Sequence, residues 1–317
     1  ILGGVSSLTN AFKVSNDLYW IDSFSGTQFT IIFKRFYKKL INSSFSFPET
    51  ADSKISILAQ NKFVLFPFIS IQKDFGYSDV TPANNSYERV DRLFQFSQEK
   101  LKSVEYIEKF HRQFQHSILE LSSYKFEFPL YIIEKQEGSV DPLNFELKNK
   151  PEFSPIKLIA NNKNYLKEII KDAIQNSYEL IVLAKGNFCF SKNYDKDIFC
   201  KIILQAHYRG CEVLVSGVRS IGSVIPISKR SFWLGDFSDA PVIILFEKSF
   251  QQILNHLENN TINNLDYFIS SHFVNKILIY PFLFSNTEIE NQNFSINQIV
   301  QKQLLNISNA FNKFNDN

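Results

Sequence analysis

The sequence predicts an α/β fold built from two tandem copies of one unit. Short apolar runs alternate with amphipathic segments, which is typical of a mostly parallel sheet flanked by helices. One segment recurs at an offset of 213 residues, the spacing of Trp20 and Trp233. The length of 317 residues fits about two domains. The repeat therefore organises the whole prediction.

The repeat keeps one register over two long stretches. Residues 4–42 align without a gap with residues 217–255, and after one inserted residue Asp52 aligns with Asp266. The last matched pairs are Asn61-Lys62 with Asn275-Lys276 and Pro67-Phe68 with Pro281-Phe282. We expect the two segments to superpose, with both tryptophans mostly buried.

Each copy is predicted to run strand, helix, helix, strand. The first strands are continuous apolar runs, which is typical of strands buried on both faces. They are Phe29–Phe33 and Val242–Phe246, and the helices that follow are Lys34–Asn42 and Glu247–Leu257. The returning strands are Phe63–Phe66 and Ile277–Tyr280, each stopped by a proline.

The second copy also has a front half. Its strands are predicted at Leu130–Ile133, Ile156–Ile159, Leu180–Leu183 and Val213–Val215, and its helices at Leu166–Ile174 and Ile198–His207. The first copy starts where the second has completed three strands, so we expect its front half upstream of Ile1. A half-sheet alone would expose apolar faces and strand edges.

These elements give four regions. Residues 1–85 form the C-terminal half of a first unit, residues 86–123 a helical connector, residues 124–290 the second unit, and residues 291–317 a C-terminal helix or tail.

Composition excludes some classes of protein. Lys+Arg 34 against Asp+Glu 32 leaves a net charge of +2, which argues against a broad nucleic-acid-binding face. No apolar run approaches the length of a transmembrane helix, and we expect no transmembrane segment. The three cysteines form no C-x-x-C pair and are expected to be buried thiols in a reducing compartment.

Two stretches carry a family resemblance. Tyr19–Phe29 and Asn61–Thr81 resemble a group of bacterial glycosyltransferase-like proteins that is frequent in Bacteroidetes. The match is most specific over Gln72–Thr81, and it covers residues 177–281 more loosely. The resemblance implies a GT-A-like fold, in which an α/β sheet carries a sugar nucleotide at its strand ends.

The resemblance also implies an acidic cluster after a central strand. Such a cluster would hold Mg²⁺ or Mn²⁺, which neutralises the departing nucleoside diphosphate. In the first unit this cluster is expected upstream of Ile1, so no metal ligand is assigned within the chain. The second unit has Lys185-Gly186-Asn187 at that place. Because a lysine repels a metal ion, no cofactor is expected there, and the unit is either non-catalytic or metal-independent, with Lys185 meeting the diphosphate.

The candidate site residues lie in the first unit. Asp52 aligns with an Ala-Asp pair of the family and is the candidate general base for the acceptor hydroxyl. It could equally be a helix N-cap, since Asp266 persists in the second unit. The candidate substrate-binding residues are Gln28, Lys73, Asp74, Tyr77 and Asp79.

Two functions follow. The first is a glycosyltransferase that moves a sugar from a nucleotide-sugar donor to a glycan, lipid-linked or protein hydroxyl. The alternative is a non-catalytic pseudo-glycosyltransferase that acts as a carbohydrate-binding or scaffold protein. We expect a cytoplasmic protein with no nucleic-acid partner, and a lipid-linked acceptor would bring it to the inner membrane face.

Overall fold

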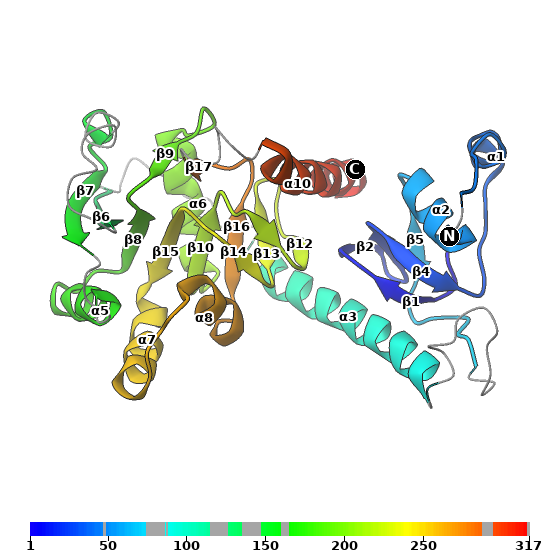
Figure 1. Cartoon of the computed structure of the whole chain (residues 1–317), viewed down its shortest axis with the longest axis horizontal. Coiled ribbons are helices and arrows are strands. Elements are labelled where there is room, and N and C mark those ends of the chain that lie inside the picture. The colour runs from blue at the N-terminus through cyan, green and yellow to red at the C-terminus, as the bar shows by residue number, and fades with distance from the viewer. Residues whose placement is uncertain are drawn as a thin grey trace. The chain divides into compact units, whose positions relative to one another are not determined.

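The chain forms two compact units in the computed structural model (Figure 1). The structure describes residues 1–46, 49–73, 86, 88–114, 126–134, 147–159, 165–286 and 294–315. The first unit comprises Ile1–Arg112 and Asn306–Asn317, and the second comprises Gln113–Leu305. The long C-terminal helix α10 (Phe294–Asn315) thus contributes residues to both units.

The described residues of the first unit form two small antiparallel sheets. One pairs β1 with β4, and the other has the order β2-β3-β5. The strands are β1 (Val5–Leu8), β2 (Ala11–Ser15), β3 (Leu18–Ile21), β4 (Phe24–Thr27) and β5 (Phe63–Leu65). The helices are α1 (Lys34–Ile41), α2 (Ala51–Leu58) and α3 (Arg89–Arg112).

The core of the first unit forms around the second sheet. Phe12 of β2 stacks on Trp20 of β3 at 5.1 Å between ring centroids, and the ring of Phe311 meets Phe12 edge-on. One face of α3 is buried, and it carries Phe94, Leu101 and Val104. Aromatic burial and an amphipathic helix therefore hold this unit together.

The second unit is built on an eight-stranded mixed sheet. Its order is β12-β13-β16-β10-β15-β8-β6-β7, and β13 and β15 run against the direction of the other strands. The strands are β6 (Phe128–Glu134), β7 (Phe153–Ile159), β8 (Leu180–Lys185), β10 (Val213–Ser216), β12 (Val224–Pro226), β13 (Ser231–Leu234), β15 (Val242–Phe246) and β16 (Lys276–Ile279).

The described residues of the second unit also form two short strand pairs and, before α10, four helices. The pairs are β9 (Phe188–Phe190) with β17 (Phe284–Asn286), and β11 (Ser220–Ile221) with β14 (Phe237–Ser238). The helices are α5 (Tyr165–Gln175), α6 (Lys196–Tyr208), α7 (Glu247–Asn259) and α8 (Leu265–His272). The strands and helices predicted for the second unit are confirmed, and their predicted ends agree with the observed ends within three residues.

One predicted strand is wrong. In the described first unit, Phe29–Phe33 forms no strand, and its only pairing is an isolated bridge between Thr30 and Leu2. Phe29 and Phe33 are 43% and 51% exposed. The aligned strand β15 is buried along its whole length because β8 and β10 flank it. An apolar run becomes a buried strand only where both of its edges find partners.

The two tryptophans and the three cysteines test the predictions of side-chain burial. Trp20 is 2% exposed, whereas Trp233 is half-buried and its indole nitrogen donates to the carbonyl oxygen of Val274 at 2.8 Å. All three cysteines are buried free thiols, as predicted. Among the described residues, no helix is long and apolar enough to cross a membrane.

Candidate functional site

The carboxyl edge of the second unit's sheet gathers polar side chains. The chain leaves β6 for its neighbour β7 on one side and then returns to β8 on the other. Such a change of direction opens the crevice in which open α/β sheets bind ligands. Lys185 ends β8 at this edge, and the amide of Gly186 donates to the carbonyl oxygen of Ile133 on β6 at 3.0 Å.

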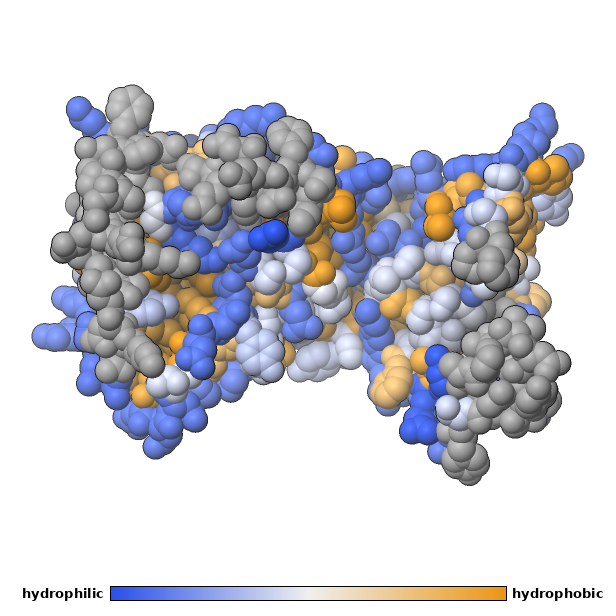
Figure 2. All heavy atoms as spheres, viewed as in Figure 1, coloured by the Kyte–Doolittle hydropathy of each residue, from blue (hydrophilic) through white to orange (hydrophobic). Residues whose placement is uncertain are grey.

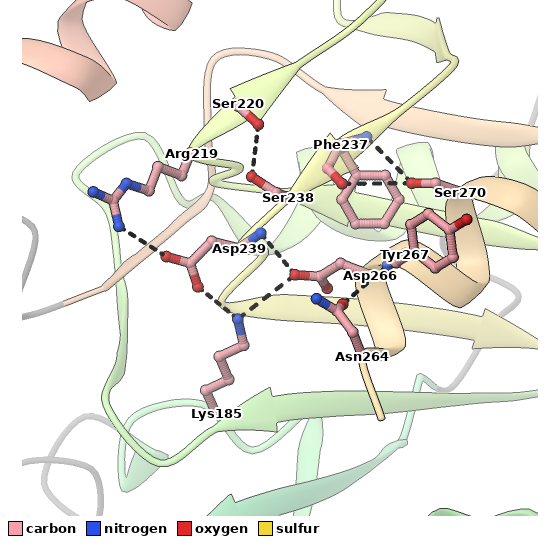
Figure 3. A network of polar contacts seen from close by, with 10 residues as sticks. All are labelled: Lys185, Arg219, Ser220, Phe237, Ser238, Asp239, Asn264, Asp266, Tyr267 and Ser270. Atoms are coloured by element: carbon pink, nitrogen blue, oxygen red, sulfur yellow. Dashed lines mark hydrogen bonds and ion pairs between the residues drawn. The ribbon is translucent and has the colours of Figure 1, made fainter. Parts of the chain in front are cut away.

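Four charged side chains meet there (Figure 3). The Lys185 Nζ lies 2.7 Å from Asp239 Oδ1 and 3.9 Å from Asp266 Oδ2. The Arg219 guanidinium lies 3.9 Å from the other oxygen of Asp239, and the Asp239 amide donates to Asp266 Oδ2 at 2.6 Å. We call these four residues the Lys185 network. One ammonium thus sits between two carboxylates at the strand ends.

Three loops place these side chains. Arg219 follows β10 after Gly217, whose φ of +84° favours glycine and whose missing Cβ leaves room for the carbonyl oxygen of Phe284. Asp239 precedes β15 and has a φ of 56°, a conformation that Asp tolerates better than most residues. Asp266 lies in the first turn of α8, which Asn264 caps by accepting the amide of Tyr267 at 3.0 Å.

Opposing effects act on the pKa of Asp266 in the network. Burial raises the pKa of Asp266, while the Lys185 charge and the amides of Asp239 and Ala240 partly offset that rise. Burial also raises the pKa of Tyr165, and the Asp266 charge adds to this rise. Lys185 and Arg219 remain 39% and 42% exposed. The network is internally neutral, and its two cations stay accessible to an anion.

Asp52 occupies the corresponding place in the first unit. Its Oδ2 accepts the amide of Gly26 at 2.5 Å, and its Oδ1 accepts the amide of Ser53 at 2.9 Å. Burial alone raises the pKa of Asp52, but the hydrogen bonds from Thr50, Gly26 and Ser53 outweigh it and hold the pKa below its usual value. Asp52 lies in the first turn of α2 and is not its N-cap, which is Thr50, and its carboxylate instead holds Gly26 of β4.

The same contacts recur at aligned positions of the two units. In each unit an Asp carboxylate accepts a backbone amide in or next to a strand, a Ser hydroxyl accepts a strand amide, a Lys ammonium donates to two helix-end carbonyls, and two Ser hydroxyls pair at 2.6 Å. The acceptors and donors are Asp52, Ser56, Lys62 and Ser7 with Ser25 in the first unit, and Asp266, Ser270, Lys276 and Ser220 with Ser238 in the second.

The described substrate-binding candidates lie close to this part of the first unit. Gln28 directly follows β4, and its amide donates to Gln72 Oε1 at 3.2 Å. Lys73 is the next residue along the chain and is exposed. The structure thus brings Gln28 close to the Gln72-Lys73 segment. Gln28 is two residues along the chain from Gly26, whose amide donates to Asp52. Asp74, Tyr77 and Asp79 lie outside the described residues.

Sequence reasoning did not select Arg219 and Asp239. Both stand at repeat positions where the first unit has uncharged residues, Ser6 and Gly26. A charged pair gained at aligned positions was the available signal, and it was not used. Within the described ranges, no group of three or more His, Cys, Asp or Glu side chains is placed to hold a metal ion.

Comparisons with known proteins give little. No family model matches the chain, and no curated protein matches it. Among solved structures, the crystal structure of A197 from STIV has a TM-score of 0.31 and 15% identity, over 48% of this chain and 81% of that one. Apo UDP-glucose pyrophosphorylase has a TM-score of 0.30 and 12% identity, over 59% and 81%. At such TM-scores neither likeness bears on fold or function.

Proposed function

We propose that the chain carries a duplicated GT-A-like unit of a nucleotide-sugar glycosyltransferase, with the transfer site in the first unit and a non-catalytic second unit. The observation that carries the proposal is the recurrence of one contact set in both units, centred on Asp52 with Gly26 and Asp266 with Asp239. The family resemblance of Tyr19–Phe29 and Gln72–Thr81 supplies the chemistry.

Strand pairing supports the duplication. In the first unit Leu2 bridges Thr30 on one side and Val64 on the other. In the second unit the aligned residue Val215 pairs with the residues aligned to those two, Ile243 and Leu278. Each of these contacts has the same parallel or antiparallel sense in both units. The shared register, the shared pairing sense and the matching Asp contacts support a duplication.

The Lys185 network supports a non-catalytic second unit. The ammonium lies between two carboxylates at the strand end where the family places its acidic cluster. It supplies there the positive charge that a metal ion would otherwise bring, and it repels a divalent cation. Sugar transfer from a nucleoside-diphosphate sugar needs positive charge that neutralises the departing diphosphate. The charge of Lys185 is already neutralised by Asp239, so it does not meet this need.

In the first unit Asp52 is proposed as a positioning residue. A general base works best when its pKa lies near the working pH, and hydrogen bonds hold the pKa of Asp52 low. Its contact with Gly26 fixes the end of β4 and with it Gln28, which meets Gln72. Asp52 would thus position the substrate-binding residue Gln28 without taking a proton from the acceptor.

A second candidate is metal-independent binding of a nucleoside diphosphate by the second unit. The observation that favours it is the exposure of both cations, Lys185 and Arg219, at the ligand edge of the sheet. An arriving diphosphate would exchange with Asp239 for these two partners. The unit would then serve as a carbohydrate-binding or scaffold module.

Calorimetric titration with UDP-, GDP- and CMP-sugars, with and without Mn²⁺, separates these functions. The proposal predicts binding that Gln28→Ala weakens and that Lys185→Ala leaves unchanged. Binding that Lys185→Ala abolishes, without dependence on Mn²⁺, would support the second candidate and contradict the first. Lack of binding by any donor would contradict the second candidate, whose two cations both lie within the described residues.

A further inference from the structure

Helix α1 of the first unit differs from every other helix with described side chains in having no buried residue. Its sequence is KRFYKKLI, over Lys34–Ile41. Lys34, Arg35, Lys38 and Lys39 make four positive charges, and the helix holds no acidic residue. Figure 2 shows blue and orange spheres side by side in the region where Figure 1 draws this helix.

Exposed apolar side chains line one face of α1. Phe33, Tyr37 and Ile41 are four residues apart and lie above one another on the helix surface. They are 51%, 49% and 79% exposed. Lys34 and Lys38 follow the first two by one residue and form a basic row beside this stripe. We call these five residues the α1 face.

The residues on either side of α1 also expose apolar side chains. Ile31 before the helix and Phe45 after it are 44% and 54% exposed. The acidic side chains described close behind are engaged elsewhere, since Glu49 pairs with Lys54 at 2.9 Å and Asp52 accepts the amides of Gly26 and Ser53. The α1 face is thus both apolar and uncompensated in charge among the described residues of this stretch.

The aligned helix α7 shows that this character is not a demand of the fold. Its Phe250, aligned with Tyr37, is 2% exposed, and Ile253 is fully buried. It has Glu247 and Gln251 where α1 has Lys34 and Lys38. α7 hides these residues where it packs against α5, which has no counterpart among the described residues of the first unit, so the comparison bears on charge: a helix in this position need not carry a basic row. The basic row belongs to α1 alone.

We propose that the α1 face binds the surface of an anionic lipid bilayer. A basic amphipathic helix with exposed aromatic and aliphatic residues is the form that lies in the membrane interface, with its apolar side at the headgroup boundary. An apolar protein surface would complement only the apolar stripe. The adjoining basic row also requires anionic groups on the surface that α1 binds. Phosphatidylglycerol or phosphatidylserine headgroups supply them.

The length of α1 sets the strength of the attachment. Eight residues are about two turns, so the helix acts as one reversible anchor and not as a stable membrane insertion. Attraction to anionic lipid amounts to about fivefold in affinity for each lysine near the surface, and salt screens it. This proposal does not rest on glycosyl transfer, and either can fail without the other.

Vesicle sedimentation tests the proposal with the whole chain. Vesicles of phosphatidylcholine alone are compared with an equal mixture of phosphatidylcholine and phosphatidylglycerol. We expect binding to the mixed vesicles, weakened by salt, and little binding to phosphatidylcholine. Lys34→Gln with Lys38→Gln should weaken binding roughly 25-fold. Ile41→Ser should weaken it while leaving the salt dependence in place.

A double variant elsewhere provides the control. Lys196 and Lys201 are exposed lysines of α6, and Lys196→Gln with Lys201→Gln removes the same charge. This variant should bind like the wild type. Equal loss in both double variants, equal binding to both vesicle types, or no binding at all would overturn the proposal. Self-association abolished by Ile41→Ser, without vesicle binding, would show that protein covers the α1 face and would also overturn it.

Discussion

Glu108 should make the first unit less stable at high pH. This carboxyl on α3 is 6% exposed, and burial raises its pKa to about 7, although the amide of Lys13, at 2.8 Å, and the charge of Arg112 partly offset the rise. In the unfolded chain the pKa returns to about 4.5. Ionising Glu108 therefore costs more in the folded state than in the unfolded state.

The size of the effect follows from this difference. Between pH 4.5 and 7 the unfolded chain loses the proton first, so folding stability falls as the pH rises through this window. At about 1.4 kcal/mol for each pKa unit, the free energy of unfolding should drop by about 2 to 3 kcal/mol from pH 5 to pH 8. Glu108→Gln keeps an acceptor for the Lys13 amide and removes the charge, so it should abolish this drop.

Urea unfolding at pH 5 and pH 8 measures this prediction. Trp20 fluorescence reports the first unit when Trp233 is replaced by Phe, because Trp20 is buried against Phe12. Glu105→Gln is the control, since Glu105 lies on the same helix but is 47% exposed in its ion pair with Lys13. That variant should change stability by less than about 1 kcal/mol. Equal pH dependence in wild type and Glu108→Gln would refute the reasoning.

Three further predictions concern both units. Lys185→Met leaves Asp266 without its nearest cation, so the second unit should lose about 1 kcal/mol at pH 8 and less at pH 5, measured by urea unfolding; the partial exposure of the pair keeps the effect small. Asp52→Ala and Asp266→Ala should each destabilise their own unit by about 1 to 3 kcal/mol, because a backbone amide loses its acceptor. If only one of the two variants loses stability, the matched roles are contradicted. Ellman's reagent should react with no thiol in the folded protein and with all three in guanidinium, and rapid reaction in the folded state would contradict their burial. The thiols are Cys189, Cys200 and Cys211.

The sequence predicts the second unit's sheet better than the first unit's. Continuous apolar runs such as Val242–Phe246 announce buried strands, and the strand forms where it is expected. The same signal at Phe29–Phe33 failed because burial depends on neighbouring strands that a local pattern does not contain. The alignment of Asp52 with Asp266 pointed to positions where the structure has matching contacts, each carboxylate accepting a backbone amide.

The charged network was only partly within reach of the sequence. Lys185 stood out because it replaces an expected acid. Arg219 and Asp239 reach it from loops at the ends of β10 and β15, strands that lie side by side in the sheet but are separated by a hairpin and a strand pair in sequence. Their pairing depends on the sheet order, which periodicity does not specify. Only a residue-by-residue comparison of the two copies would have marked them.

Hydrogen–deuterium exchange of the whole chain, with and without a bound sugar nucleotide, tests the central claim most directly. Peptides that contain Gln28, Asp52 and Gln72 report the first unit, and peptides that contain Lys185 and Arg219 report the second. The proposal predicts ligand-dependent protection of the first set with the second set unchanged. Protection confined to the Lys185 and Arg219 peptides would contradict a transfer site in the first unit.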